Sequence, residues 1–327
     1  MTPDPEALLP IIRSAGSVPG HGRALIAYVR WMLPKPASGL VLVFLHGIGS
    51  YGEPYGHMVE GLRGSIDAVY LPDMRGHGRS GGARGDLTSR GAVIHDIGAV
   101  VEVARRDNPG ARIVLGGESM GALFALGFTD VHGEELAGLV LTSPALALNW
   151  RSVLHSSTIA DSLGHSDVLT AGVRVQGGVG GEIPRDPHFY DRVRTDPLML
   201  QRVGLRYLAV VQAFRWDWFA RYRATVCLPV LILQGDGDRL VDVRAVRVLN
   251  ALLRRSRLCE FRAAWHNLFW DPETPAAVAA MADWFGQVAD GSVAPSSGRE
   301  GGVTTLIRIW RVLVHRSTAA SRAPGLG

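Results

Sequence analysis

The chain has 327 residues, of which 47% are hydrophobic and 20% are charged, and this composition excludes a mainly disordered protein. The formal net charge of +4 comes from the tail, because residues 303–327 contain Arg308, Arg311, Arg316 and Arg322 and no acid. The rest of the chain is neutral, whereas nucleic-acid enzymes usually carry a basic surface, so we expect no nucleic-acid partner.

No run approaches the ~18 consecutive apolar residues that a membrane-spanning helix needs. The first residues include Asp4 and Glu6 and are interrupted by Pro10, which is not typical of a secretory signal. Cys227 and Cys259 are the only cysteines, and they form neither a disulfide framework nor a zinc-ligand spacing. The sequence therefore predicts a cytoplasmic protein without a metal or other cofactor. It does not predict the oligomeric state.

Taken in chain order, residues 1–22 are predicted to be an N-terminal leader with a short helix. Short β-rich apolar runs then predict strands at 24–33, 40–45, 68–71, 113–115, 139–141, 230–233 and 260–264. Helical patterns separate them at 91–106, 120–131, 243–254 and 275–288. Alternating strands and helices predict an α/β fold, with a mostly parallel sheet covered by helices on both faces.

One long interval, residues 143–229, contains no convincing core strand. An unstructured loop of that length is unusual inside a compact domain, so we expect a small, mostly helical insertion that includes a helix at 197–214. Residues 291–302 are rich in glycine and serine and predict a flexible linker.

The sequence Gly117-Glu118-Ser119-Met120-Gly121 fits the pattern G-x-S-x-G. It follows a predicted strand and opens a predicted helix, which is the setting of a nucleophile elbow. Glycines at 117 and 121 allow so tight a turn, and the helix N-terminus favours developing negative charge on the serine. Ser119 is therefore the candidate nucleophile.

A serine hydroxyl needs a base that accepts its proton and an acid that orients the base. In proteins with this elbow the acid and then the histidine follow the serine along the chain. Asp236 and Asp238 follow the predicted strand at 230–233, and His266 follows the predicted strand at 260–264. His266 is thus the candidate base, either aspartate could serve as the acid, and Asp242 is best explained as a helix N-cap.

The loop His46-Gly47-Ile48-Gly49 follows the strand at 40–45. In this type of site such a loop and the residue after the nucleophile supply two backbone N–H groups for the oxyanion, here Ile48 and Met120. We expect His46, Gly47 and His57 near the substrate, although a loop histidine such as His46 can equally bond to backbone groups.

Two further polar clusters are interpreted as structural. The segment 73–80 (DMRGHGRS) holds Asp, His and Ser close together, but it is typical of a tight turn whose side chains bind loop amides. His95 and Asp96 lie in the middle of a predicted helix among apolar residues.

Five blocks in this order, HGIGSYGEPY, DMRGHGRSGG, GGESMGA, PVLILQGDGDRLVD and WHNLFWDP, resemble the monoacylglycerol lipase and lysophospholipase-like branch of the α/β-hydrolases, also called the serine aminopeptidase-type domain. The resemblance implies an α/β-hydrolase domain over 23–290 with an inserted helical cap at about 144–228. It implies Ser119 as nucleophile, His266 as base and, of the two aspartates, Asp238 as acid. The cap is poorly matched, and the tail lies outside the family pattern.

The expected function is hydrolysis of carboxylic esters of single-chain lipids, of monoacylglycerol or lysophospholipid type, through an acyl-enzyme on Ser119. One alternative is an acyltransferase, thioesterase or amidase that uses the same residues. The other is a non-catalytic ligand-binding protein on the same scaffold.

The tail provides a separate hypothesis. Residues 303–316 form a basic amphipathic helix when placed on a helical wheel, with Arg308 and Arg311 on the polar face and Trp310 on the apolar face. Such a helix suits peripheral contact with a membrane, and packing against the body of the protein is the alternative.

Overall fold

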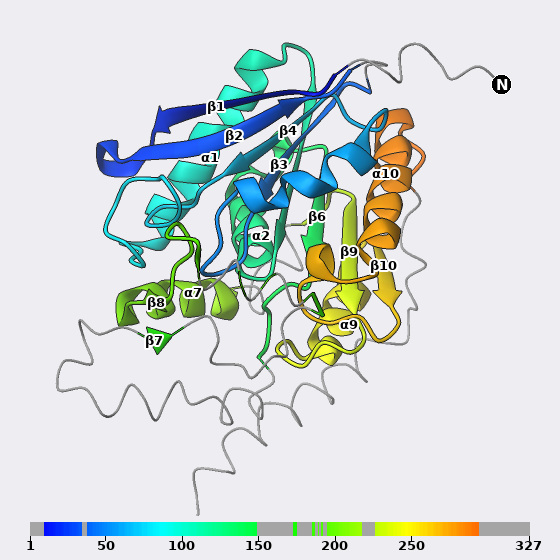
Figure 1. Cartoon of the computed structure of the whole chain (residues 1–327). Helices are drawn as coiled ribbons and strands as arrows, with labels where there is room; N and C mark the ends of the chain where they lie inside the picture. The colour runs from blue at the N-terminus through cyan, green and yellow to red at the C-terminus, as the bar shows by residue number, and fades with distance from the viewer. Residues whose placement is uncertain are drawn as a thin grey trace, which may run out of the picture.

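The computed structural model describes residues 10–34, 38–148, 173–174, 185–186, 189, 191, 195–217 and 226–293. Within these residues, eight strands form one sheet in the order β1-β2-β4-β3-β5-β6-β9-β10 (Figure 1). Strand β2 pairs antiparallel with both β1 and β4, and all other neighbouring pairs are parallel. The strands are β1 (Ile12–Pro19), β2 (Leu25–Met32), β3 (Leu40–Leu45), β4 (Ala68–Pro72), β5 (Arg112–Glu118), β6 (Gly138–Thr142), β9 (Val230–Gly235) and β10 (Ser256–Phe261).

Helices cover both faces of the sheet because the central strands are apolar on both sides. All six residues of β3 are buried, and alternate residues belong to two different core clusters. One cluster joins the sheet to α1 (Arg90–Asp107), α2 (Met120–His132) and α9 (Val243–Leu252). The other joins it to α10 (Thr274–Asp290) and to the short 3₁₀ helices η3 (Glu53–Met58), η4 (Glu60–Leu62) and η7 (Leu268–Trp270).

A smaller group of elements comes from the interval 143–229. Figure 1 shows α7 (Leu205–Asp217) and the two-stranded pair of β7 (Val173–Arg174) and β8 (Arg202–Val203) beyond the end of the sheet where β6 and β9 finish. Tyr207 of α7 donates a hydrogen bond to the sulfur of Met120, at the start of α2. The remaining described 3₁₀ helices are η2 (His21–Arg23) and η5 (Gly133–Glu135).

The predicted α/β fold is confirmed, and most predicted elements lie within a few residues of the observed ones. Three predictions are wrong in detail. Residues 12–19 of the predicted leader form the edge strand β1, which was not expected, and residues 1–9 lie outside the described residues. The last strand runs from 256 to 261 instead of 260–264. The helix predicted at 197–214 is α7 at 205–217, and residues 202–203 before it form the short strand β8.

Other predictions cannot be compared with the structure. Much of the proposed cap at 144–228 lies outside the described residues, as do the linker from residue 294 onward and the tail 303–327. Among the helices that the structure does describe, none combines the length and apolar character needed to cross a membrane.

A buried ion pair ties α1 to the loop after β4. Arg75 Nε and Nη2 contact the two carboxylate oxygens of Asp96 at 2.7 and 2.8 Å, and both side chains are buried. Asp96 also accepts a hydrogen bond from the His21 backbone amide, and Arg75 donates one to the His21 carbonyl. The pair thus joins three segments, in agreement with the structural interpretation of Asp96.

We expect Asp96→Ala to lower the free energy of unfolding by about 3–5 kcal/mol, because it leaves the Arg75 charge buried without a partner. Glu102→Ala is the matched control on the same helix, where Glu102 is exposed and pairs with Arg105. The control should lose less than about 1 kcal/mol. Urea denaturation measures both variants, and equal losses would contradict the assigned role of the buried pair.

Candidate active site

Ser119 occupies a sharp turn between β5 and α2. Its backbone is strained, with φ 57° and ψ −111°. The flanking glycines leave no room for a side chain, because a Cβ at Gly117 would lie 2.4 Å from the Gly121 carbonyl carbon and one at Gly121 would lie 2.2 Å from the Leu45 carbonyl oxygen. The local geometry is that of a nucleophile elbow, as the pentapeptide predicts.

The structure brings Ser119, His266 and Asp238 together at the C-terminal edge of the sheet. His266 Nε2 lies 2.9 Å from Ser119 Oγ, and His266 Nδ1 lies 2.8 Å from Asp238 Oδ2. All three side chains are buried. These three residues form a hydrogen-bonded Ser–His–Asp triad, called the relay below. Such a triad can activate the serine hydroxyl, with the histidine as base and the aspartate as its orienting partner.

The three aspartates that follow β9 have different partners. Only Asp238 contacts His266, whereas Asp236 accepts a hydrogen bond from the Ala263 amide at 2.6 Å. Asp242 caps α9 by accepting from the Arg244 amide, which confirms its interpretation as an N-cap. The geometry therefore favours Asp238 over Asp236 as the acid.

Asp238 is held firmly in place. Its Oδ1 accepts hydrogen bonds from the amides of Leu240 and Val241 at 2.8 and 2.9 Å, and its Oδ2 accepts a third from Gln234 Nε2 at 3.0 Å. Burial by itself raises the pKa of Asp238. The charge of His266 and the hydrogen bonds to the carboxylate lower it by more, so the net pKa lies below its usual value. The carboxylate therefore stays ionised beside the imidazole.

The pKa of His266 lies above its usual value. Burial lowers it, but the charge of Asp238 and the hydrogen bond to it raise it more, and the charge of Glu118 raises it as well. An imidazole in this environment is stabilised when it carries a proton, which is the form that a general base takes after it accepts one.

Backbone groups around Gly47 fix the loop that follows β3. His46 Nε2 accepts from the Met74 amide at 2.9 Å, so the proton is on Nδ1, which donates to the Gly47 carbonyl at 2.8 Å. The Ser50 amide donates to the same carbonyl at 3.2 Å. In a planar trans peptide the N–H points away from the preceding C=O, so these contacts set the direction of the Ile48 N–H.

The two predicted oxyanion donors differ in their local structure. In the described part of the chain, no group accepts a hydrogen bond from the Ile48 amide. Met120 is the first residue of α2, where N–H groups have no partner within the helix. Both amides are thus available to a ligand.

His46 and Gly47 are engaged by the protein itself. Both ring nitrogens of the fully buried His46 bond to backbone groups, and the Gly47 amide donates to Tyr55 Oη at 3.0 Å. These contacts favour the interpretation that both residues shape the loop, and their contact with substrate stays a prediction.

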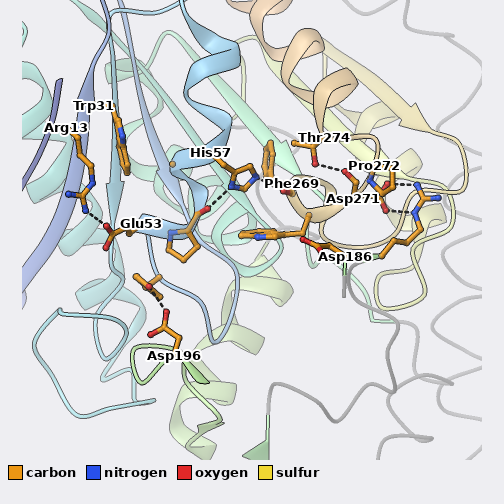
Figure 2. A pocket seen from close by; sticks show the side chains of 15 residues that line it. Arg13, Trp31, Glu53, His57, Asp186, Asp196, Phe269, Asp271, Pro272 and Thr274 are labelled. Atoms are coloured by element: carbon orange, nitrogen blue, oxygen red, sulfur yellow. Dashed lines mark hydrogen bonds and ion pairs between the residues drawn. The ribbon is translucent and has the colours of Figure 1, made fainter. Parts of the chain in front are cut away.

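His57 lines a cavity of about 1000 Å³ that Figure 2 shows from close by. Its Nδ1 and Nε2 face the carbonyls of Pro54 and Phe269 at 2.7 and 2.5 Å. None of the three relay residues lines this cavity. A role of His57 in binding substrate therefore also stays a prediction.

The segment 73–80 forms the predicted structural turn. The Asp73 carboxylate accepts from the amides of Gly52 and Arg79 at 2.8 and 2.7 Å, and Ser80 Oγ accepts from the Ala27 amide at 2.8 Å. These side chains bind backbone amides, as expected for a structural turn.

Three residues near the relay were not predicted from the sequence: Gln234, Tyr55 and Glu118. Gln234 supports Asp238, and Tyr55 Oη donates to Glu118 Oε2 at 2.7 Å. The sequence did contain a signal for Glu118, because an acid occupies the variable position before the serine of the pentapeptide, at the end of an apolar strand.

Among the residues described by the structure, no group of three or more His, Cys, Asp or Glu side chains is arranged to hold a metal ion.

The chain is similar to known proteins over most of its length. A family model described as serine aminopeptidase, S33, matches residues 36–273. The chain is 26% identical over 274 residues to a monoacylglycerol lipase of Mycolicibacterium smegmatis, covering 83% of this chain and 96% of that protein. It is 25% identical to the phospholipase YtpA of Bacillus subtilis, covering 74% of this chain and 93% of the relative.

A solved structure gives the same picture of the fold. A soluble variant of the monoglyceride lipase of Saccharomyces cerevisiae, in complex with a substrate analogue, superposes with a TM-score of 0.73 at 18% identity, covering 86% of this chain and 97% of the other. The family match spans well over half of the chain. The protein therefore belongs to the serine aminopeptidase S33 family, has the α/β-hydrolase fold and is a carboxylic ester hydrolase.

Proposed function

We propose that the protein hydrolyses carboxylic esters of single-chain lipids, of monoacylglycerol or lysophospholipid type, through an acyl-enzyme on Ser119. The observation that carries the proposal is the continuous relay from Ser119 Oγ through His266 to Asp238. The similarity to a monoacylglycerol lipase and a phospholipase supports the lipid substrate.

In the proposed mechanism, Ser119 Oγ attacks the acyl carbon while His266 Nε2 accepts its proton. The N–H groups of Ile48 and Met120 stabilise the negative charge on the carbonyl oxygen. Asp238 stabilises the imidazolium, which then gives its proton to the departing glycerol oxygen. Water, activated by His266 in the same way, attacks the acyl-enzyme and releases the fatty acid and Ser119.

The interval 144–228 is proposed to be a cap over this site. Support comes from α7, whose Tyr207 contacts the residue after the nucleophile and whose Arg215 donates to the Ala145 carbonyl at 2.9 Å. A cytoplasmic location and membrane contact through 303–316 are also proposed, and both rest on the sequence alone.

A chain-length series tests the proposed substrate. We expect kcat/KM for monoacylglycerols to rise with the length of the acyl chain. Each buried CH₂ should lower the activation free energy by up to about 0.8 kcal/mol. Released glycerol and fatty acid are measured, and lysophosphatidylcholine is assayed in parallel.

An aminoacyl anilide and a thioester serve as controls for the amidase and thioesterase alternatives, and added alcohol as acceptor tests acyl transfer. A flat response to chain length, or faster cleavage of the anilide or thioester than of every ester, would overturn the lipid-ester proposal. Binding of monoacylglycerol without turnover would favour the non-catalytic alternative.

A further inference from the structure

A second buried acid lies directly beside the nucleophile. Glu118 is the last residue of β5, and its side chain is fully buried. Its Oε2 accepts a hydrogen bond from Tyr55 Oη at 2.7 Å, and Asn267 Nδ2 approaches the same oxygen at 3.4 Å. Its Oε1 is buried without a hydrogen-bond partner in the described part of the chain. Burying a carboxyl group this way is costly, and the proposed mechanism gives it no task.

Tyr55 connects this acid to the oxyanion loop. Its hydroxyl donates to Glu118 and accepts from the Gly47 amide at 3.0 Å. The Tyr55 ring is fixed by three aromatic neighbours, with centroids 5.6 Å from Phe44, 6.1 Å from Phe269 and 4.7 Å from Trp270. The ring contacts therefore fix the position of the hydroxyl, and its single proton is directed to Glu118 because the Glu118 oxygen is an acceptor while the Gly47 N–H is a donor.

These contacts complete the restraint of Gly47. His46 and Ser50 hold its carbonyl, and Tyr55 holds its amide, so the peptide planes on both sides of the residue are fixed. The second of these planes contains the N–H of Ile48. Without an acceptor on the Tyr55 side, the peptide plane before Gly47 would lose its restraint, and only the contacts of the Gly47 carbonyl with His46 and Ser50 would still direct the Ile48 N–H.

We infer that Glu118 is a positioning residue that, acting through Tyr55, holds Gly47 and so aims the Ile48 N–H at the oxyanion. The inference rests on the proposed function, since it assigns to Glu118 and Tyr55 a part in the same reaction. Neither residue touches the reacting atoms.

The charge of Glu118 provides a second readout, because it acts on the pKa of His266. The titratable groups that act on it are His266 after β10, Tyr55 on η3 and Asp238 after β9. Burial raises the pKa of Glu118 to about 7, although His266 and Tyr55 lower it. The ionised carboxylate in turn raises the pKa of His266. A neutral side chain at 118 should therefore lower the pKa of His266.

The sign of the expected pH effect follows from the task of His266. The imidazole accepts the Ser119 proton only when it is neutral, so activity falls as the pH drops through its pKa. Glu118→Gln should move this acid limb of the kcat/KM profile to lower pH, by about one unit or less. The acid limb thus reports the charge of Glu118 beside His266, whereas kcat and the labelling rate at constant KM report the positioning of the Ile48 N–H.

The test compares Tyr55→Phe, Glu118→Gln and the double variant with the wild type, with Tyr70→Phe as the matched control. Tyr70 is another buried tyrosine whose hydroxyl bonds to Asn108 and Asp107 on the α1 side of the sheet. Each protein is assayed with a soluble short-chain ester and with a fluorophosphonate probe, whose phosphoryl oxygen occupies the same oxyanion position. Melting curves and the active-site titre correct for protein that fails to fold.

We expect Tyr55→Phe to lower kcat and the labelling rate about 10- to 100-fold, somewhat less than the loss of an oxyanion donor, with KM within about twofold. Glu118→Gln keeps an oxygen that accepts from Tyr55, so its kcat should fall less than that of Tyr55→Phe while its acid limb shifts. Because Glu118 acts through Tyr55, adding Glu118→Gln to Tyr55→Phe should lower kcat at alkaline pH no further.

Other outcomes separate the two proposals. A wild-type protein that is labelled but cleaves no ester would overturn the proposed function, and the labelling rates would still decide the role of Glu118. Labelling rates and kcat equal to those of Tyr70→Phe in both single variants would overturn the positioning role alone, wherever the acid limb lies. A wild-type protein that the probe never labels would overturn both.

Discussion

Replacing Ser119 with alanine should reduce ester hydrolysis by about 10⁴-fold or more, because no other group in the relay can form the acyl-enzyme. The strained backbone at Ser119 serves the reaction and not the packing, so the variant should fold normally, with a melting temperature equal to or above that of the wild type. Steady-state turnover of a short-chain ester and circular dichroism measure the two effects.

Ser256→Ala is a suitable control for this variant. Ser256 begins β10, at the end of the strand opposite to His266, and its hydroxyl donates to the Asn250 carbonyl at 2.9 Å. The control should retain wild-type turnover. Hydrolysis by Ser119→Ala at a rate near that of the wild type would rule out the elbow serine as nucleophile.

Asp238→Asn should lower kcat by about 10⁴-fold, because an amide favours the wrong imidazole tautomer and no longer stabilises the imidazolium. The pKa of His266 should fall as well, since burial lowers it and the Asp238 charge that opposes burial is gone. What activity remains should therefore extend to lower pH. The measurement is a pH profile of kcat/KM for the purified variant.

Asp236→Asn supplies the matched comparison, two residues away and with the same chemical change. Its carboxylate bonds to the Ala263 amide of an exposed turn and does not reach His266, so we expect a loss of less than about tenfold. If Asp236→Asn lost as much activity as Asp238→Asn, or more, the orientation of the relay in the structure would be wrong.

The sequence predicted best those parts of the fold whose signal is local. The apolar run of β3 and the glycines around Ser119 have few structural alternatives, so the central strand and the elbow appear where they were expected. The edges of the sheet were predicted less well. β1 contains serine, glycine and only two large apolar residues, and it is a strand because it pairs along its length with β2.

In the active site, too, contacts that depend on tertiary packing were not predicted from the sequence. From the residues alone, Asp236 and Asp238 were equivalent, because they share one turn and only the path of that turn decides which carboxylate meets His266. The contact of Tyr55 with Glu118 joins residues 63 positions apart through a cluster of aromatic rings. No periodicity or spacing predicts such a contact, since it depends on how η3 packs against β3 and β5.

Trapping the acyl-enzyme is the most direct test of the proposal that Ser119 is the nucleophile. The protein is mixed with an excess of a p-nitrophenyl ester, quenched in acid within the first turnovers, and analysed by intact-mass spectrometry and peptide mapping. We expect a burst of p-nitrophenol close to one equivalent per active site and an added acyl mass on the peptide that contains Ser119. Turnover with the acyl group on another residue, or hydrolysis that persists in Ser119→Ala with no acyl adduct in either protein, would contradict the central claim.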